Sequence, residues 1–330
     1  MTCSKNSAKH FAIGRRSLAA ALLIGSLWTV GCNSSTEPVA PAVDKKVVAT
    51  NYPLAYFAER LLGQKAKVTF PVPEDADPAH WSPSDESIAV MQSADLIVVN
   101  GAGYESWRDT VTLPNDRIID TTAHVTKSLI ADEQAVTHSH GPEGEHTHVH
   151  MATHTWLAPH LAVAQSTALA MALADEMREL GPQLTANAVA LSEDLVAFDG
   201  RFQEVTEASR EWHVIGSHPV YQYLGQRLDW NLHSLHWESG VTPSDEEFAA
   251  LETRLTETPS RLMLWEDEPT PATRQRLEAM GLTIVVYRTC GSRPESGDFL
   301  SEMRANLDRL EAAIENIANQ PEASAEPGEQ

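Results

Sequence analysis

Cysteine and basic residues are scarce in this sequence. Its 330 residues include three cysteines, Cys3, Cys32 and Cys290, which are too few and too scattered for a disulfide framework or a thiolate zinc cluster. Lys and Arg number 24 against 46 Asp and Glu, so the formal net charge is −22 at pH 7. A surface of that sign repels phosphate backbones and anionic membranes. The composition therefore argues against a nucleic-acid-binding protein and favours cationic ligands.

Glycine and proline are also not abundant, at 17 and 19 residues. Hydrophobic residues make up 42% of the chain and charged residues 21%, which is typical of a packed globular protein and excludes a fibrous or disordered one. At roughly 150 residues per domain, the length predicts two domains. The unusually frequent residue is histidine, with 14 copies.

The N-terminal region has the pattern of an export signal. Residues 1–16 carry basic residues and no acid, and the apolar run Leu18–Val30 is too short to span a bilayer. Gly31-Cys32 resembles a lipobox, in which Cys32 is acylated and becomes the first residue of the mature chain. We therefore expect a periplasmic or extracytoplasmic lipoprotein that contacts the membrane only through its lipid anchor. The alternatives are export without lipid, a twin-arginine signal at Arg15-Arg16, and a buried N-terminal helix.

The remaining chain contains the same layout twice. Lys46–Leu62 is a β-rich run, a polar turn with Pro53 and an apolar helical stripe, and Trp212–Leu228 repeats it with Pro219, 166 residues after Pro53. The alternative explanation is chance similarity between generic α/β units.

Two matching helix starts support the repeat. Ser82-Pro-Ser-Asp-Glu86 and Thr242-Pro-Ser-Asp-Glu246 are 160 residues apart. In each, the pattern predicts a hydroxyl N-cap at the first residue, Pro at the first helical position and acids in the first turn.

Hydrophobic strand runs complete each copy. Asp95–Asn100 corresponds to Arg261–Glu266, and Arg117–Asp120 corresponds to Thr283–Tyr287. Strands that alternate with helices predict an α/β fold with two similar lobes, each with a parallel sheet. Between the lobes, Pro159–Ser209 is Ala- and Leu-rich and predicts a long backbone helix, divided at Gly181-Pro182.

These patterns together predict the domain organisation and a metal cleft between the lobes, at the carboxyl ends of their strands. The predicted segments are a signal peptide (1–32), a flexible tether (33–44), an N-terminal lobe (45–158), a helical linker (159–209), a C-terminal lobe (210–318) and a disordered acidic tail (319–330).

A histidine-rich loop lies at 137–150 within the first lobe. Gly, Pro and Glu separate its imidazoles, so it cannot form a core and is expected to be exposed. Several imidazoles on one tether chelate zinc, copper or nickel in alternative sets, which predicts weak accessory metal capture. The alternative is a merely solvated polar loop. The histidines are His138, His140, His146, His148 and His150.

Three other histidines lie in loops where α/β sites form. His80 precedes the capped helix of the first lobe, His154 follows the histidine-rich loop, and His218 lies at the first strand-to-helix turn of the second lobe. Each alone is more simply a surface or structural histidine. Together with the tethered chelator they favour one shared metal site.

The chain resembles the metal-binding cluster of ABC-transporter solute-binding proteins, the zinc and manganese class, from about residue 46 to 317. The resemblance is carried by Val48–Leu54, Ala94–Gly101, the histidine-rich insert, His154–Pro159 and Ser217–Leu224. It implies two α/β lobes joined by a rigid helix, three histidine ligands plus a carboxylate in the cleft, and delivery of the ion to a membrane permease.

The chain departs from the family pattern at the ligands. The family usually has Asp-Pro-His at the first ligand, whereas Asp77-Pro78-Ala79 places His80 one residue later. Before His154 the usual Asp-Pro is replaced by Ala152-Thr153.

The acidic ligand that commonly follows the last strand is missing, because Arg288, Thr289 and Cys290 stand there. The candidates for a fourth ligand are Glu266, Asp267, Cys290 or a water. We favour Glu266, because carboxylates at strand ends face the cleft; its alternative role is to accept a hydrogen bond from a histidine ligand. Cys290 is more simply a small buried hydrophobic residue.

Three imidazoles and one oxygen suit tetrahedral Zn²⁺, whereas Mn²⁺ prefers more oxygen ligands. We therefore predict a monomeric, non-enzymatic protein that captures zinc with high affinity and delivers it to an ABC permease. Zinc affinity should fall below about pH 6.5, where imidazoles protonate. The alternatives are a zinc buffer, chaperone or surface adhesin with the same site, and a zinc hydrolase. The last is disfavoured because the sequence lacks His-Glu-x-x-His and Gly-x-Ser-x-Gly.

Overall fold

The computed structural model describes residues 45–74, 76–131, 151–237 and 240–320, which all belong to one compact unit. The predicted signal peptide with Cys32, the tether, the histidine-rich loop with its five histidines, and residues 321–330 of the tail lie outside the described residues.

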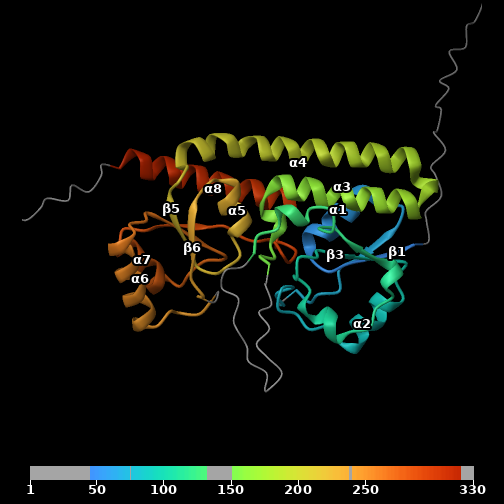
Figure 1. The fold of residues 1–330 in the computed structure, drawn as a ribbon, viewed down its shortest axis with the longest axis horizontal. Helices are drawn as coiled ribbons and strands as arrows, with labels where there is room; N and C mark the ends of the chain where they lie inside the picture. Colours follow the sequence, from blue (N-terminus) through green and yellow to red (C-terminus); the bar gives the residue numbers. More distant parts are fainter. Residues whose placement is uncertain (1–44, 75, 132–150, 238–239, 321–330) are drawn as a thin grey trace, which may run out of the picture. The chain divides into compact units, whose positions relative to one another are not determined.

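Each half of the described chain forms a four-stranded parallel sheet (Figure 1). The first has the order β2-β1-β3-β4 and the second the order β6-β5-β7-β8, so the two sheets are built alike. Central strands pair in equivalent registers, with Val47 opposite Leu96 in the first sheet and Val214 opposite Leu262 in the second. The predicted α/β fold of two similar parallel lobes is confirmed. The strands are β1 Lys46–Ala49, β2 Lys67–Thr69, β3 Leu96–Val99, β4 Ile118–Asp120, β5 His213–Gly216, β6 Asn231–Ser234, β7 Leu262–Trp265 and β8 Thr283–Val286.

Helices pack around both sheets. In Figure 1, α4 runs along both lobes with α3 and α8 beside it, whereas α2 and the α6–α7 pair lie on the opposite side of their sheets. The α-helices are α1 Tyr52–Leu62, α2 Asp85–Gln92, α3 Pro159–Glu176, α4 Gly181–Ser209, α5 Gln222–Arg227, α6 Asp245–Glu257, α7 Pro271–Ala279 and α8 Phe299–Asn319. Short 3-10 helices occur at Ser106–Thr110, Asn115–Arg117, Thr126–Ser128, Thr155–Leu157 and Arg178–Leu180. Within the described parts of the chain, none of the helices is both long and apolar enough to cross a membrane.

The predicted caps of α2 and α6 were placed two residues too early. The N-caps are Ser84 and Ser244, not Ser82 and Thr242, and the prolines lie outside the helices. Each capping serine has an extended backbone, and its hydroxyl accepts a hydrogen bond from the N–H three residues on, as an N-cap must. At Ser244 the carboxylate of Glu247 accepts a hydrogen bond from the serine N–H, which completes a capping box. The predicted acids do occupy both first turns.

The repeat is imperfect at the first helix of each lobe. Pro53 lies in the first turn of α1, whereas Pro219 precedes the six-residue α5, which begins at Gln222. The backbone turns before α5, where the Val220 N–H donates to the His218 carbonyl oxygen. The edge strands β2 and β6 were not predicted, because their sequences, Lys-Val-Thr and Asn-Leu-His-Ser, contain no run of apolar residues.

The helical linker consists of α3 and α4, separated by the 3-10 turn Arg178–Leu180. Gly181 and Pro182 lie in the first turn of α4. Backbone N–H groups in the first turn have no partner within the helix, so a proline there costs no hydrogen bond. The 29 residues of α4 extend for about 43 Å at 1.5 Å per residue. At the other end of the chain, α8 ends at Asn319, so the first residue of the predicted tail (319–330) is helical.

One hydrophobic core joins the two lobes. It contains residues of both sheets together with α1, α3, α4 and α8. Phe299, the first residue of α8, packs on Tyr56 and Phe57 of α1 with ring centroids 5.6 and 5.5 Å apart. The segment between β8 and α8 also reaches the first lobe, since the Gly291 carbonyl oxygen accepts a hydrogen bond from the Tyr52 N–H at 2.8 Å. The second lobe is therefore anchored to the first along its C-terminal segment.

Candidate metal-binding site

A pocket of about 350 Å³ lies at the carboxyl ends of strands from both lobes. It brings together the three histidines and the glutamate that the sequence predicts, His80, His154, His218 and Glu266. This is the cleft position expected for parallel α/β sheets. The other lining residues are Asp77, Ala79, Gly103, Tyr104, Ser106, Thr153, Pro219 and Val220.

His154 is the most enclosed of these side chains, with 6% of its surface exposed. Its ring lies 5.5 Å from that of Tyr104 and 5.0 Å from that of Trp156. Burial lowers the pKa of His154 to about 4, so the imidazole is neutral at neutral pH, as a metal ligand must be. Nδ1 lies 3.1 Å from the Thr153 hydroxyl, which leaves Nε2 for a ligand.

His80 lies on the exposed side of the pocket, and 70% of its side chain is accessible. Its Nδ1 is 2.9 Å from the carboxylate of Asp77, three residues earlier. The other Asp77 oxygen accepts the Ala79 N–H at 3.0 Å, so the carboxylate shapes the loop and orients the ring. Asp77 was not predicted to have a role, although an Asp three residues before a loop histidine was a usable signal.

His218 and Glu266 come from neighbouring parallel strands of the second lobe. His218 follows β5 and Glu266 follows β7, and the two strands pair directly. The His218 Nδ1 lies 3.4 Å from the Glu266 Oε1. The His218 ring is 6.3 Å from that of His80 and 6.4 Å from that of His236. His236 is an exposed histidine that follows β6, and it was not among the predicted site residues.

The predicted ligands share the pocket without forming a finished coordination sphere. In the described ranges, no group of three or more His, Cys, Asp or Glu side chains is arranged to hold a metal ion. Exposure of His80 and the partial exposure of His218 and Glu266 leave room for these side chains to move.

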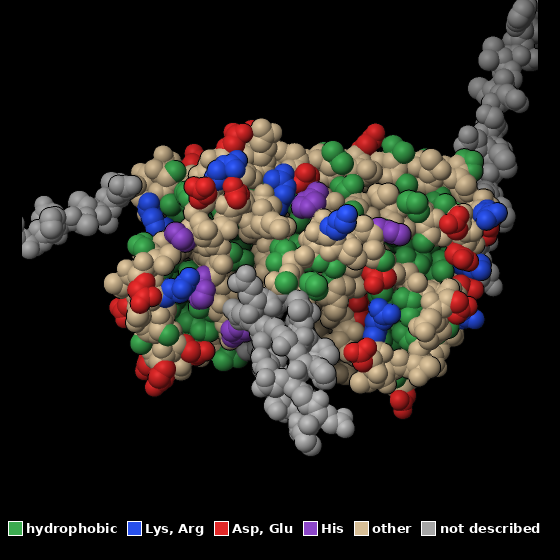
Figure 2. Space-filling view, in the orientation of Figure 1, with side chains coloured by type: hydrophobic (Ala, Val, Ile, Leu, Met, Phe, Trp, Pro, Cys, Tyr) green, Lys and Arg blue, Asp and Glu red, His purple; other side chains and the backbone are tan. Residues whose placement is uncertain are grey.

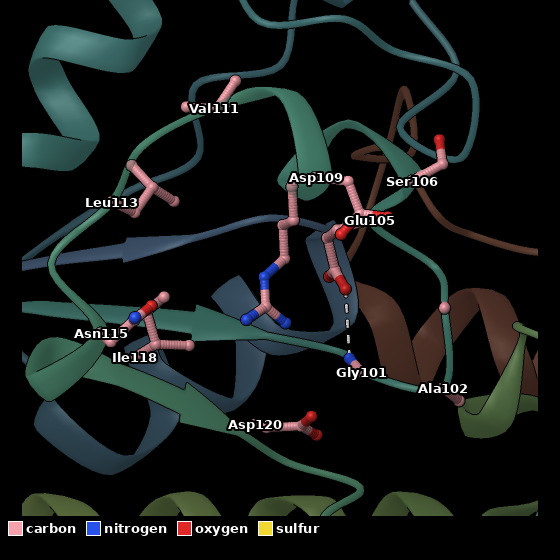
Figure 3. Close-up of a pocket in the computed structure, with 12 residues that line it drawn as sticks. Gly101, Ala102, Glu105, Ser106, Asp109, Val111, Leu113, Asn115, Ile118 and Asp120 are labelled. Carbon is pink, nitrogen blue, oxygen red and sulfur yellow. Dashed lines mark hydrogen bonds between the residues drawn. The ribbon is translucent and has the colours of Figure 1, made fainter.

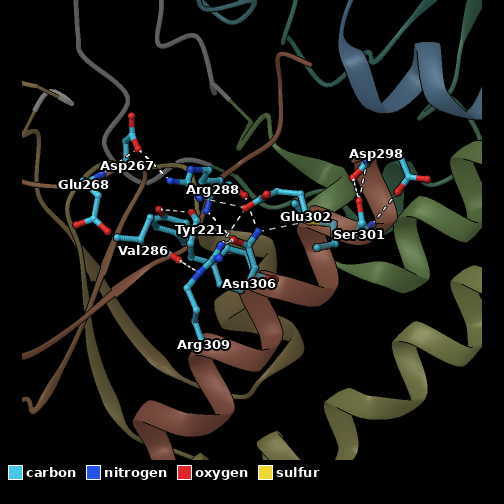
Figure 4. Close-up of polar contacts among 12 residues, drawn as sticks. Tyr221, Asp267, Glu268, Val286, Arg288, Asp298, Ser301, Glu302, Asn306 and Arg309 are labelled. Carbon is cyan, nitrogen blue, oxygen red and sulfur yellow. Dashed lines mark hydrogen bonds and ion pairs between the residues drawn. The ribbon is translucent and has the colours of Figure 1, made fainter. Parts of the chain in front are cut away.

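The two other protein candidates for a fourth ligand do not line this pocket. Asp267 pairs with Arg288 at 3.5 Å, and Arg288 also contacts Glu302 at 3.4 Å (Figure 4). The Asn306 side chain bonds both the N–H and the carbonyl oxygen of Arg288, which fixes the backbone after β8. Cys290 is buried, and burial raises the pKa of its thiol, so the reactive thiolate is disfavoured.

A tight loop after β3 forms the wall of the pocket beside His154. Gly101, Ala102 and Gly103 all have positive φ, which is strained for the alanine. The buried Glu105 carboxylate holds this loop by accepting hydrogen bonds from the N–H groups of Asn100 at 2.7 Å and Gly101 at 3.1 Å. Figure 3 shows the bond to Gly101.

The Glu105 carboxylate also accepts the hydroxyl of Thr50 at 2.6 Å, and burial raises the pKa of this carboxyl. A second cavity of about 570 Å³ lies against the same loop and shares Gly103 and Ser106 with the histidine pocket. Tyr104 and Glu105 were not predicted from the sequence, because their contacts include residues that are distant in the sequence, His154 and Thr50.

The described surface agrees with the acidic composition. Figure 2 shows Asp and Glu side chains spread over the visible face, with Lys and Arg among them. Two parallel α/β lobes with a histidine- and carboxylate-lined pocket between them are the architecture of a metal-binding solute-binding protein.

The chain belongs to the ZnuA family, described as zinc-uptake complex component A, periplasmic, whose family model matches residues 47–313. Membership of a family of uptake-complex components agrees with the prediction that the protein is not an enzyme.

Two curated relatives are similar over much of the chain. Zinc-binding lipoprotein AdcA of Streptococcus pneumoniae is 27% identical over 238 residues, which are 70% of this chain and 46% of AdcA, so the chain matches about half of that relative's length. The high-affinity zinc uptake system protein ZnuA of Bacillus subtilis is 26% identical over 86% of this chain and 92% of its own.

A solved structure confirms the fold. The Zn(II)-bound ZnuA-like domain of Streptococcus pneumoniae AdcA superimposes with a TM-score of 0.69 at 20% identity, covering 82% of this chain and 99% of that domain.

Proposed function

We propose that the protein captures Zn²⁺ outside the cytoplasm and delivers it to the membrane permease of an ABC importer. The observation that carries the proposal is the pocket lined by His80, His154, His218 and Glu266. Relatives described as a zinc-binding lipoprotein and a high-affinity zinc uptake protein support the same cargo.

The ligand set is three imidazole nitrogens, from His80, His154 and His218, and an oxygen of Glu266. Zinc accepts such a set in a tetrahedron with Zn–N distances of about 2.0–2.1 Å. Two ligands come from each lobe, because His80 and His154 precede the linker helices while His218 and Glu266 follow them. His80 is the side chain that moves most on binding, since it is the most exposed of the four and lies in a loop.

The same proposal includes the surroundings of the site. The protein is a monomer anchored through a lipid on Cys32. Its histidine-rich loop, with His138, His140, His146, His148 and His150, collects zinc weakly and raises its local concentration. The acidic surface attracts the cation.

Calorimetric titration of the purified protein with Zn²⁺ and Mn²⁺ tests the metal site. We expect one tight zinc site, weaker manganese binding, and a loss of at least about 100-fold in zinc affinity for His154→Ala and His218→Ala. His124→Ala is the control, because His124 is exposed and does not line the pocket.

A variant lacking residues 138–150 should keep the tight site and lose only weak ones. Loss of all zinc binding with the loop, or tight binding that survives both histidine substitutions, would refute the pocket as the site. The transport role is tested in cells: deletion of the gene should reduce uptake of radioactive zinc under zinc limitation, and unchanged uptake would favour a buffer or adhesin.

A further inference from the structure

Tyr104 has a buried hydroxyl that no described residue of the chain pairs with. Only 2% of the residue is exposed, and its hydroxyl oxygen has no hydrogen-bond partner among the residues that the structure describes. A buried polar group without a partner is rare and costs free energy. Tyr104 also lines the histidine pocket, so the unpaired hydroxyl belongs to a residue of the proposed metal site.

The ring that carries this hydroxyl is firmly held. It meets His154 edge-on, at 5.5 Å and 82°, and Trp156 at 5.2 Å and 78°. Gly291 from the second lobe lies beside the hydroxyl, since a Cβ atom at that position would be 3.2 Å from the Tyr104 oxygen. The neighbouring Glu105 fixes the backbone of the loop through the N–H groups of Asn100 and Gly101.

The surroundings keep the hydroxyl in its donor form. Burial raises the pKa of Tyr104 well above its ordinary value, and the negative charges of Asp77, Glu105 and Glu266 act in the same direction. Of these three carboxylates, Asp77 and Glu266 line the pocket with Tyr104. Asp77 is bonded to His80 and Glu105 to the loop. Glu266 pairs with His218 at 3.4 Å and is the one of the three that we propose as a zinc ligand, so it is the acceptor that zinc binding would place for Tyr104.

We infer that Tyr104 is a positioning residue of the loaded pocket, whose hydroxyl donates a hydrogen bond to the Glu266 carboxylate when that carboxylate ligates the ion. The inference rests on the proposed function and adds a residue to it. The second oxygen of a ligating carboxylate needs a donor, and a preformed donor orients the ligand and lowers the cost of assembling the site.

The test is Tyr104→Phe, which removes the hydroxyl and keeps the ring. Zinc affinity measured by calorimetry should fall by roughly 10-fold, as expected for a lost hydrogen bond to a charged group. The metal-free variant should be at least as stable to denaturant as the wild type, because an unpaired buried hydroxyl has been removed. A merely structural role for the hydroxyl would lower stability as well.

Tyr287→Phe is the matched control. Its hydroxyl is also buried and unpaired among the described residues, but Tyr287 does not line the pocket, so zinc affinity should stay at the wild-type value. In a Glu266→Ala background, Tyr104→Phe should have no further effect on zinc affinity, because the acceptor is gone.

Three outcomes would overturn the inference. Unchanged zinc affinity in Tyr104→Phe, or an equal loss in the Glu266→Ala background, would refute the hydrogen bond while leaving zinc capture intact. Absence of zinc binding by the wild type would refute the proposed function itself, and with it this role of Tyr104.

Discussion

Replacing Glu105 by alanine should weaken the fold through one local mechanism. The substitution removes the acceptor of three hydrogen bonds, from the hydroxyl of Thr50 and the N–H groups of Asn100 and Gly101. The Thr50 hydroxyl keeps a second acceptor, the Val98 carbonyl oxygen at 3.3 Å, so two buried N–H groups lose their partner.

An unsatisfied buried donor costs about 1–3 kcal/mol, so the loss should be about 2–6 kcal/mol. The substitution also removes a carboxylate whose burial is unfavourable, which offsets part of this loss. We expect a net loss of about 3 kcal/mol in the free energy of unfolding. At about 2–4 °C per kcal/mol, the melting temperature should fall by roughly 6–12 °C.

Glu105→Gln should lie between alanine and the wild type. Its amide keeps one acceptor oxygen but turns an NH₂ group toward one of the backbone donors, which leaves a single N–H unpaired. Urea unfolding of the metal-free protein measures the series, with Glu295→Ala as an exposed control expected within about 0.5 kcal/mol of the wild type. Stability of Glu105→Ala within 1 kcal/mol of the wild type would refute the view that this carboxylate holds the loop.

Three further predictions concern single residues. Burial lowers the pKa of His154 to about 4, so as the pH falls this imidazole is protonated in the unfolded chain before it is protonated in the folded protein. The free energy of unfolding should therefore fall by about 2 kcal/mol between pH 7.5 and 5. Urea titrations should show that His154→Gln lacks this loss; an identical pH dependence would contradict it. Burial raises the pKa of the Cys290 thiol, so alkylation followed by peptide mass spectrometry should find Cys290 modified only after unfolding, and rapid modification of the native protein would be inconsistent with this burial. Ser244→Ala should lower the free energy of unfolding by about 1 kcal/mol, because it removes the cap of α6, whereas Thr242→Ala should lower it by less than about 0.5 kcal/mol. If urea unfolding gave the reverse order, Thr242 would be the N-cap, as the sequence predicted.

The architecture was accessible from the sequence because its signals are local. Buried strands such as β3 and β7 are continuous apolar runs, and Gly181-Pro182 marks the break between the linker helices. The edge strands β2 and β6 carry no such run, and none of their residues is fully buried. The caps at Ser84 and Ser244 were misplaced because both hydroxyl residues of each motif can cap, and only the backbone decides between them.

The site was accessible only in part. His80, His154, His218 and Glu266 could be selected because they follow strands or occupy loops at the edge where parallel sheets bind ligands, and the structure does place them in one pocket. Their role as ligands stays a prediction.

Tyr104 and Glu105 could not be selected from the sequence. Their importance depends on packing against distant residues, such as His154 for Tyr104 and Thr50 for Glu105.

The packing of Phe299 on α1 has a consequence for how the chain folds. The first lobe can form its sheet soon after residue 120 is made, but its helix α1 remains without the Phe299 ring until almost the whole chain has been synthesised. The contact joins residues more than 200 positions apart, and loop closure over that length slows folding. Chains shortened before α8 should therefore expose apolar surface in both halves, and the intact protein should unfold in one cooperative transition instead of lobe by lobe.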